Sequence, residues 1–145
     1  MPTPSLGVWR LRCDGGSRGN PGPGAFGFVL SDESGREVEA RGEYLGTVTN
    51  NVAEYRGLIA GLEAAATLGA KVLEVSMDSE LVVRQMTGEY RVKNEGLKSL
   101  HAAAKQAATR IPQLRFTAVR REDNTRADQL VNETLDRILE SESPR

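Results

Sequence analysis

Hydrophobic and polar residues alternate along the first third of the chain. Residues 8–13 place three apolar side chains on one side and two arginines on the other, which predicts a half-buried strand. Residues 25–30 and 36–45 also have the character of strands. Because short connections separate these three segments, we expect them to form an antiparallel meander.

The spacing of hydrophobic residues then changes to the period of a helix. Hydrophobic residues recur at helical spacing from Tyr55 to Ala66, and Gly69 stands where a glycine commonly ends a helix. The rest of the chain is predicted in the same way: strands at 71–77 and 114–119, and helices at 80–87, 95–110 and from Asn124 onward.

The resulting order, βββαβααβα, predicts the α/β fold class. We expect a meander followed by right-handed crossovers, in a mixed five-stranded sheet with helices packed on it. The length of 145 residues is that of one domain with a core of its own. We therefore expect a single domain over residues 1–145, with a core at about 7–139 and loose ends at 1–6 and 140–145.

Composition narrows the class of protein. A hydrophobic content of 39% with 27% charged residues is ordinary for a soluble globular protein, and no apolar run approaches the ~20 residues that cross a bilayer. We therefore expect a cytoplasmic protein without membrane association. The single cysteine, Cys13, cannot form an internal disulfide, and its place in a strand favours a small buried hydrophobic residue over a reactive thiol.

The net charge of −1 argues against a protein whose main task is to hold nucleic acid, since such domains are usually strongly basic. An enzyme that touches nucleic acid through a local basic patch is still compatible with this charge.

A glycine-rich stretch follows Asp14. Five of the next ten residues are glycine and two are proline, which predicts a turn rather than a continuing strand. Such a turn exposes backbone N–H groups beside a carboxylate, which suits a metal ion together with a phosphate chain. Residues 22–27 fit the dinucleotide pattern G-x-G-x-x-G, but a predicted strand follows where that motif requires a helix, so we reject this match.

Four carboxylates stand at the ends or beginnings of predicted elements: Asp14, Glu54, Asp78 and Asp128. Two follow strands, where ligand sites of open α/β sheets gather, and two lie on the flank of a helix's apolar stripe. Each also has a structural explanation: a turn opening for Asp14, a capping box of Asn51 with Glu54, a helix cap for Asp78 or Ser79, and a helix N-terminus for Asp128. Because all four could share one edge of the sheet, a common site is the stronger interpretation.

Four carboxylates at one edge would repel each other and raise their pKa values unless cations lie between them. Magnesium accepts carboxylate oxygens and also substrate phosphates. Two such ions about 4 Å apart activate water and stabilise the leaving oxygen of a phosphodiester. The pattern therefore indicates metal-assisted phosphodiester hydrolysis.

Four segments resemble, in order and spacing, the motifs of type 1 ribonucleases H (ribonucleases HI). They are residues 14–22 (DGGSRGNPG), 49–55 (TNNVAEY), 75–79 (VSMDS) and 121–128 (REDNTRAD). The resemblance extends from about residue 8 to residue 136. It implies the ribonuclease H-like fold and an endonuclease that cuts the RNA strand of RNA–DNA hybrids, leaving 3′-hydroxyl and 5′-phosphate ends.

The resemblance also implies roles for particular residues. Asp14, Glu54, Asp78 and Asp128 would be catalytic and would hold two Mg²⁺ or Mn²⁺ ions. The implied substrate contacts are Gly16, Ser17, Asn20, Thr49, Asn50, Asn51 and Lys93, with auxiliary roles for Arg121 and Asn124. The asparagines would read the 2′-hydroxyls of the RNA in the minor groove, although turn formation and capping also explain them. The hybrid is the implied partner, and we expect a monomer without an obligate protein partner.

The chain departs from the family pattern in three places. Glu80 stands where many members have a glutamine that touches RNA, and the loop before Asp128 has no histidine, so Arg121 is our candidate for contacting the departing phosphate. The only histidine, His101, lies in an alanine-rich helix and is interpreted as a packing or surface residue. Residues 84–99 lack the basic protrusion that holds the hybrid in some members, so we expect weak, salt-sensitive and distributive binding.

Two other functions are compatible with the fold. A non-catalytic module that binds hybrid or double-stranded RNA would need no carboxylate quartet and should be more basic than this chain. Another nuclease of the superfamily, such as a junction resolvase or integrase, would not need the two asparagines before Glu54.

Overall fold

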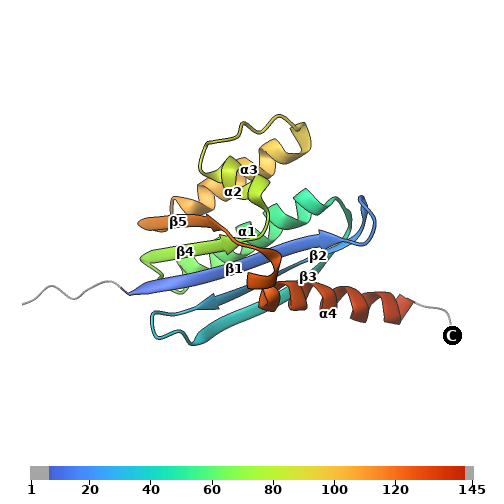
Figure 1. Ribbon diagram of the computed structural model, residues 1–145, viewed down its shortest axis with the longest axis horizontal. Coiled ribbons are helices and arrows are strands. Elements are labelled where there is room, and N and C mark those ends of the chain that lie inside the picture. The colour runs from blue at the N-terminus through green and yellow to red at the C-terminus, as the bar shows by residue number, and fades with distance from the viewer. Residues whose placement is uncertain (1–6, 143–145) are drawn as a thin grey trace, which may run out of the picture.

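The structure, a computed structural model, describes residues 7–142 (Figure 1). The elements are β1 (Val8–Ser17), β2 (Gly22–Ser31), β3 (Glu37–Val48), α1 (Asn50–Thr67), β4 (Val72–Met77), α2 (Glu80–Met86), α3 (Glu95–Ala108), β5 (Gln113–Ala118), a single 3₁₀ turn (Arg121–Asp123) and α4 (Thr125–Glu142). The strands lie in the order β3-β2-β1-β4-β5. The first three form an antiparallel meander, and β4 and β5 run parallel to β1. The predicted α/β class and mixed five-stranded sheet are confirmed.

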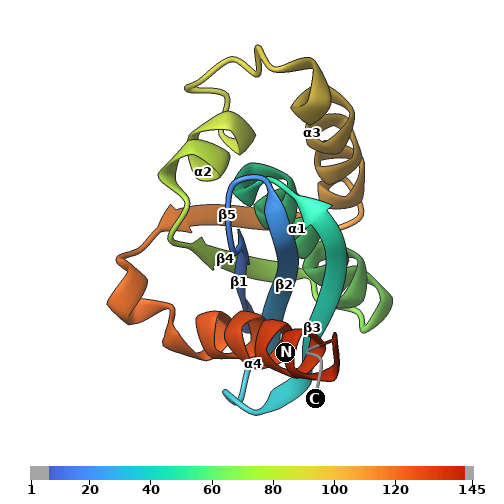
Figure 2. The ribbon, with the colours of Figure 1, turned by 90° about the vertical axis from the view of Figure 1, so that its right-hand side faces the viewer.

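The helices cover the two faces of the sheet unequally (Figures 1 and 2). Helix α1 packs on β1 and β2, and α2 and α3 lie on the same side. The main core fills this side, where Leu11, Phe28, Tyr55 and Leu62 are fully buried. Within residues 7–142, helix α4 is the one helix on the other side, over β1, β2 and β3, with a smaller cluster of apolar residues beneath it.

The glycine-rich stretch corrects one prediction. It does not form a long turn: β1 continues through Ser17 and β2 begins at Gly22, so only four residues connect the strands. Glycine is needed in these strands because other backbone segments approach them closely. A Cβ on Gly15 would overlap the Ala53 carbonyl of α1, and one on Gly27 would lie 2.7 Å from the Ala127 carbonyl oxygen of α4. The glycines therefore serve packing rather than flexibility.

Smaller differences concern the ends of elements. Strand β3 extends to Val48, three residues beyond its predicted end. Helix α4 continues to Glu142, so residues 140–142 are helical rather than loose. The predicted loose segments at 1–6 and 143–145 lie outside the described residues. Between residues 7 and 142, no helix combines the length and apolar character that a membrane crossing requires.

Candidate active site

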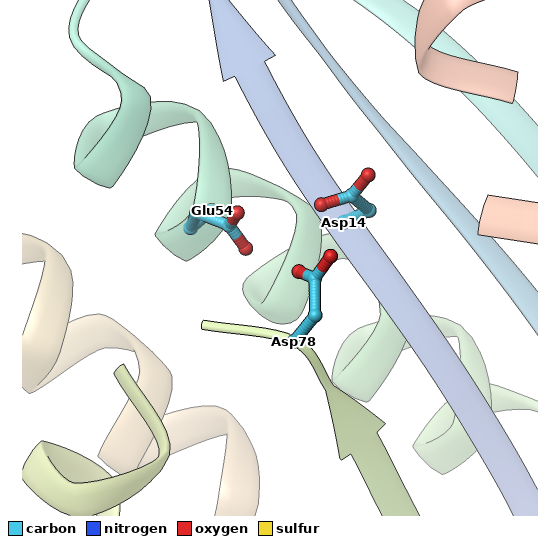
Figure 3. Close-up of side chains that lie close together, drawn as sticks. All are labelled: Asp14, Glu54 and Asp78. Atoms are coloured by element: carbon cyan, nitrogen blue, oxygen red, sulfur yellow. The ribbon is translucent and has the colours of Figure 1, made fainter. Parts of the chain in front are cut away.

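Three of the four carboxylates meet at one end of the sheet (Figure 3). Asp14 lies in β1, Asp78 directly follows β4, and Glu54 comes from α1; one carboxylate oxygen of each lies within 4.8 Å of those of the other two. The parallel register explains the first two, because Cys13 pairs with Met77 and the next residue of each chain segment is the aspartate. The predicted meeting of these side chains is confirmed.

Helix α1 brings Glu54 to this cluster because β1 has no side chain at Gly15. The backbone of Ala53 and Glu54 lies against Gly15, and Gly57 one turn later allows close contact with the Asp14 carbonyl. The alternative explanation of Glu54 as part of a capping box with Asn51 is excluded. The N-cap is Thr49, whose Oγ1 accepts from the Val52 N–H at 3.3 Å, so Glu54 lies past the first turn and is free to face the aspartates.

Asp128 completes the group from the first turn of α4. Its carboxyl group lies beside that of Asp14, whose pKa it helps to raise. One turn later, Asn132 Nδ2 donates to Asp128 Oδ2 at 3.3 Å, which helps to orient the carboxylate. All four predicted carboxylates therefore line one cleft.

Without bound cations, the carboxylates of this cluster repel one another. Burial, followed by the charges of Asp78 and Asp128, raises the pKa of Asp14 to about 7. Burial, followed by the charge of Asp14, also raises the pKa of Glu54. The cation beside Asp78 is Arg121, whose Nε lies 3.9 Å from Asp78 Oδ2, and its side chain is 81% exposed. Such an exposed arginine compensates the buried charge only weakly.

The donor set fits a divalent cation. Glu54 Oε2 is buried and has no hydrogen-bond partner among residues 7–142, although a buried carboxylate oxygen normally has one. Magnesium and manganese prefer carboxylate oxygens, and their charge would remove the repulsion that raises these pKa values. Asp14, Glu54 and Asp78 are the residues that would hold a cation, with Asp128 beside them.

The carboxylates lie in a cleft of about 510 Å³. Predicted residues on its walls are Gly16, Ser17, Asn50, Asn51 and Arg121. Four polar residues of the same walls were not among the predicted site residues: Arg18, Ser79, Arg120 and Asn132. The arginines could have been predicted, because Arg18 lies within the first motif and Arg120 directly precedes the fourth. Asn132 could be predicted only from the position of α4 beside Asp14.

Comparison with known proteins identifies the family. A family model described as reverse transcriptase-like (RVT_3) matches residues 12–134. The chain is 45% identical over 123 residues to ribonuclease HI of Halobacterium salinarum, covering 85% of this chain and 62% of that protein. The crystal structure of RNase H1 from that archaeon superposes with a TM-score of 0.86 at 43% identity, over 90% of this chain and 99% of that one.

The chain belongs to the ribonuclease H family. Two further relatives agree with this. LC11-RNase H1 in complex with RNA/DNA hybrid gives a TM-score of 0.85 at 46% identity, over 90% of this chain and 99% of that chain. Bifunctional protein Rv2228c of Mycobacterium tuberculosis is 45% identical over 133 residues, which are 90% of this chain but 36% of that protein. The chain thus spans between a third and two thirds of the length of these curated relatives.

A hydrogen-bonded pair of segments forms the rim of this ribonuclease H cleft. Asn50 Oδ1 accepts from the Ser17 N–H at 2.9 Å and from Ser17 Oγ at 3.0 Å. Asn20 Oδ1 accepts from the Asn50 N–H at 3.0 Å. These bonds fix the β1–β2 connection to the start of α1. Asn20 and Thr49 themselves are exposed and do not line the cleft.

Two other predicted residues lie elsewhere. Lys93 is exposed in the segment between α2 and α3 and does not line the cleft. Asn124 is fully buried, and its Nδ2 donates to the Cys13 carbonyl at 2.9 Å. Asn124 therefore holds β1 in place just before Asp14, so the auxiliary role predicted for it would be one of positioning from the interior.

The structure also shows the contacts of Glu80 and His101, which concern the departures from the ribonuclease H pattern, and of Cys13. Glu80 pairs with Arg84 at 2.6 Å on α2, so its charge is directed along the helix. His101 Nε2 lies 3.1 Å from the Gln85 carbonyl oxygen, and its ring meets the edge of Tyr55, which confirms a packing role. Cys13 is fully buried, and burial raises the pKa of its thiol, so the interpretation as a buried hydrophobic residue is confirmed.

Proposed function

We propose that this chain is an endoribonuclease that hydrolyses the RNA strand of RNA–DNA hybrids with the help of two Mg²⁺ or Mn²⁺ ions, leaving 5′-phosphate and 3′-hydroxyl ends. The observation that carries the proposal is the group of four carboxylates in one cleft, one of which, Glu54, has a buried oxygen without a hydrogen-bond partner among residues 7–142. The family supports it, because the relatives include a ribonuclease HI and an RNase H1 that was crystallised with an RNA/DNA hybrid.

The four carboxylates would hold the ions and fix the position of the reacting phosphate. Bound divalent cations there would supply a water of lowered pKa and stabilise the leaving oxygen. Burial keeps the side chains of Asp14 and Glu54 in fixed orientations, which favours the geometry that catalysis needs. Asn132 constrains Asp128 in the same way from α4.

Arg121 is placed to act on the departing phosphate. It follows β5, lines the cleft and reaches Asp78 at 3.9 Å, while most of its side chain is exposed to solvent. A flexible guanidinium at this position can pair with a phosphate and move away with it. This would provide part of the role that a loop histidine has in other family members.

Asn50 is our candidate for recognising RNA. Its Oδ1 is held by Ser17, and its Nδ2 donates no hydrogen bond among residues 7–142. Ser17 therefore orients the amide through its oxygen, and the NH₂ group is available to a ligand on the wall of the cleft. A 2′-hydroxyl can accept a bond from it, and DNA has no such group.

The test of the proposal is cleavage of a labelled RNA–DNA hybrid with Mg²⁺, with Mn²⁺ and with a chelator. We expect cleavage of the RNA strand with either metal and none with the chelator, and no cleavage of double-stranded DNA. Product ends are identified by their response to a phosphatase and a 5′-phosphate-dependent exonuclease. Metal-independent cleavage, or products with 3′-phosphates, would contradict the proposed chemistry.

Asn50→Ala is expected to lower kcat/KM on the hybrid by about tenfold, the value of a lost hydrogen bond of roughly 1.4 kcal/mol. Hybrids with a single 2′-deoxynucleotide at successive positions locate the contact. At the contacted position the deoxy substitution should slow the wild type and leave the variant unchanged. Ser17→Ala keeps the amide and the bond from the Ser17 N–H to Asn50 Oδ1, and loses only the bond from Ser17 Oγ, so we expect a smaller loss than for Asn50→Ala. Equal sensitivity of Asn50→Ala and wild type at every position would remove Asn50 from RNA recognition.

A further inference from the structure

One face of the sheet is uncovered beside the active site. Helices α1, α2 and α3 lie on one side of the sheet, and among residues 7–142 the helix on the other side, α4, does not pack over β4 and β5. Helix α4 occupies that side only over β1, β2 and β3. The first half of β1, with β4 and β5, therefore presents its outward side chains to solvent.

The outward side chains follow from the alternation of the strands. Leu11 and Cys13 of β1 point into the main core, so Arg10, Arg12 and Asp14 point to the other side. Residues 73, 75 and 77 of β4 are buried in the same core, which directs Glu74, Ser76 and Asp78 outward. The catalytic aspartates thus belong to the same face as the two arginines.

The register arranges this face in rows that lead away from the carboxylates. The row next to Asp14 and Asp78 contains Arg12, Ser76 and Thr117. The row beyond it contains Arg10, Glu74 and Arg115. Successive rows lie about 6.7 Å apart, the length of two residues along a strand. Arg120 and Arg121, which follow β5, line the cleft at the near end.

The charge of these rows is largely uncompensated. Arg10 pairs with Glu74 at 3.6 Å. Arg12 and Arg115 are exposed and form no ion pair within the described part of the chain. Because the whole chain has a net charge of −1, this concentration of arginine is local rather than a general property of the surface. Arginines that are free of acidic partners are well suited to phosphate groups.

We propose that this arginine face (Arg10, Arg12 and Arg115) binds a single-stranded continuation of the RNA strand beyond the hybrid that occupies the cleft. The inference rests on the proposed function, because it requires an RNA–DNA hybrid bound at the carboxylates. The RNA strand of that hybrid would continue past the carboxylates along the adjoining rows. Charge complementarity with the phosphates and continuity with the cleft both favour this occupant. The face offers no stacked aromatic platform among its outward residues, so recognition is by charge and does not depend on sequence.

The test compares a hybrid with blunt ends to the same hybrid with a ten-nucleotide RNA extension at the 5′ or the 3′ end of its RNA strand. At low salt, an extension of one polarity is expected to raise kcat/KM of the wild type about fivefold, and the double variant Arg12→Ala/Arg115→Ala should bring the ratio of extended to blunt substrate close to one. The slope of log K against log salt concentration for binding to the extended hybrid should become shallower by about 1.4 in the double variant. This is about 0.7 for each lost contact with a phosphate of a single strand. Glu74→Gln is expected to increase the advantage of the extension, because it removes the one anion of the row.

Arg110→Ala/Arg137→Ala is the matched control, because it removes the same charge as the test variant. Both arginines are exposed, and neither lies in β1, β4 or β5: Arg110 follows α3 and Arg137 lies in α4. The proposal is overturned if neither extension helps the wild type, or if the control loses as much as the test variant. A protein partner on this face would give the first of these results.

Failure of the proposed function is recognised separately. If the blunt hybrid is not cleaved, fluorescence anisotropy with a labelled twelve-nucleotide RNA still tests the face. We expect Arg12→Ala/Arg115→Ala to bind this RNA about tenfold more weakly than the control variant, and equal affinities would overturn the inference.

Discussion

Glu54→Gln is expected to abolish hybrid cleavage, by about a thousandfold or more, and at the same time to stabilise the metal-free protein. The activity is lost because an amide cannot supply the anionic ligand that a divalent cation requires. The stability is gained because the wild-type carboxylate is buried, has an unpartnered oxygen and lies beside the charge of Asp14. A glutamine at this position is neutral and can donate to the Asp14 carboxylate. We expect a gain of about 1–3 kcal/mol near pH 8, or about 3–8 °C in Tm for a domain of this size.

The gain should depend on pH in a defined direction. Burial raises the Glu54 pKa above its unfolded value, so the folded wild type holds a proton that the unfolded chain has already released. Wild-type stability therefore falls as the pH rises from the unfolded pKa, roughly 4.3, through the raised folded pKa. The free energy of unfolding of the variant does not fall in this way. The variant should therefore be no more stable than wild type near pH 4 and increasingly more stable as the pH rises toward 8.

Thermal unfolding with a chelator at pH 4, 6 and 8 measures this effect, and saturating Mg²⁺ or Mn²⁺ provides the control. Metal binds the folded wild type more tightly than the variant, so it should narrow or reverse the difference in Tm at pH 8. A variant that is less stable than wild type at pH 8 in the chelator would show that the carboxylate cluster is not strained. Retained cleavage would exclude Glu54 from the metal site.

Gly15→Ala is expected to destabilise the fold by about 3 kcal/mol or more and to lower the urea midpoint by about 1–2 M. The added Cβ would overlap the Ala53 carbonyl and lie 2.5 Å from the Glu54 backbone nitrogen. Both contacts are with backbone atoms of α1, so no side-chain rotation relieves them. The helix must move away from β1, which also displaces Glu54 from Asp14.

The matched control is Gly16→Ala, one residue along the same strand. The atom that a Cβ would meet there is Asn50 Oδ1 at 4.0 Å, an ordinary contact distance. Urea unfolding of this variant should differ from wild type by less than about 1 kcal/mol. If the two alanine variants were equally stable, close packing of α1 on β1 would not be what requires glycine at position 15.

The sequence alone predicted the order of elements, because the hydrophobic period distinguishes strands from helices locally. It also predicted that Asp14 and Asp78 each follow an apolar strand segment, although β1 continues past Asp14 to Ser17. The four motifs together identified the ribonuclease H family, which the comparisons confirm. The single-domain organisation and the cytoplasmic location stay predictions.

Local patterns failed where distant segments approach each other. The glycines after Asp14 have the composition of a turn, but antiparallel pairing of residues 14–17 with residues 24–27 keeps most of the stretch in strands. The spacing of Asn51 and Glu54 allows a capping box, but the N-cap lies two residues earlier, at Thr49. The next residue, Asn50, is bonded to Ser17 and Asn20. Asn124 has the appearance of a site residue and lies in the interior, bonded to the strand that carries Asp14.

The sequence by itself therefore determined the fold class, the family and the four carboxylates, because each depends on residue types at short spacing. Only the tertiary structure decided what surrounds them: the close approach of α1 at Gly15, the unpartnered Glu54 oxygen, and the rows of Arg12 and Arg115 beside the aspartates. Sheet register and the burial of charge are properties of residues far apart in the chain, and they acquire physical meaning once the strands are paired and water is excluded.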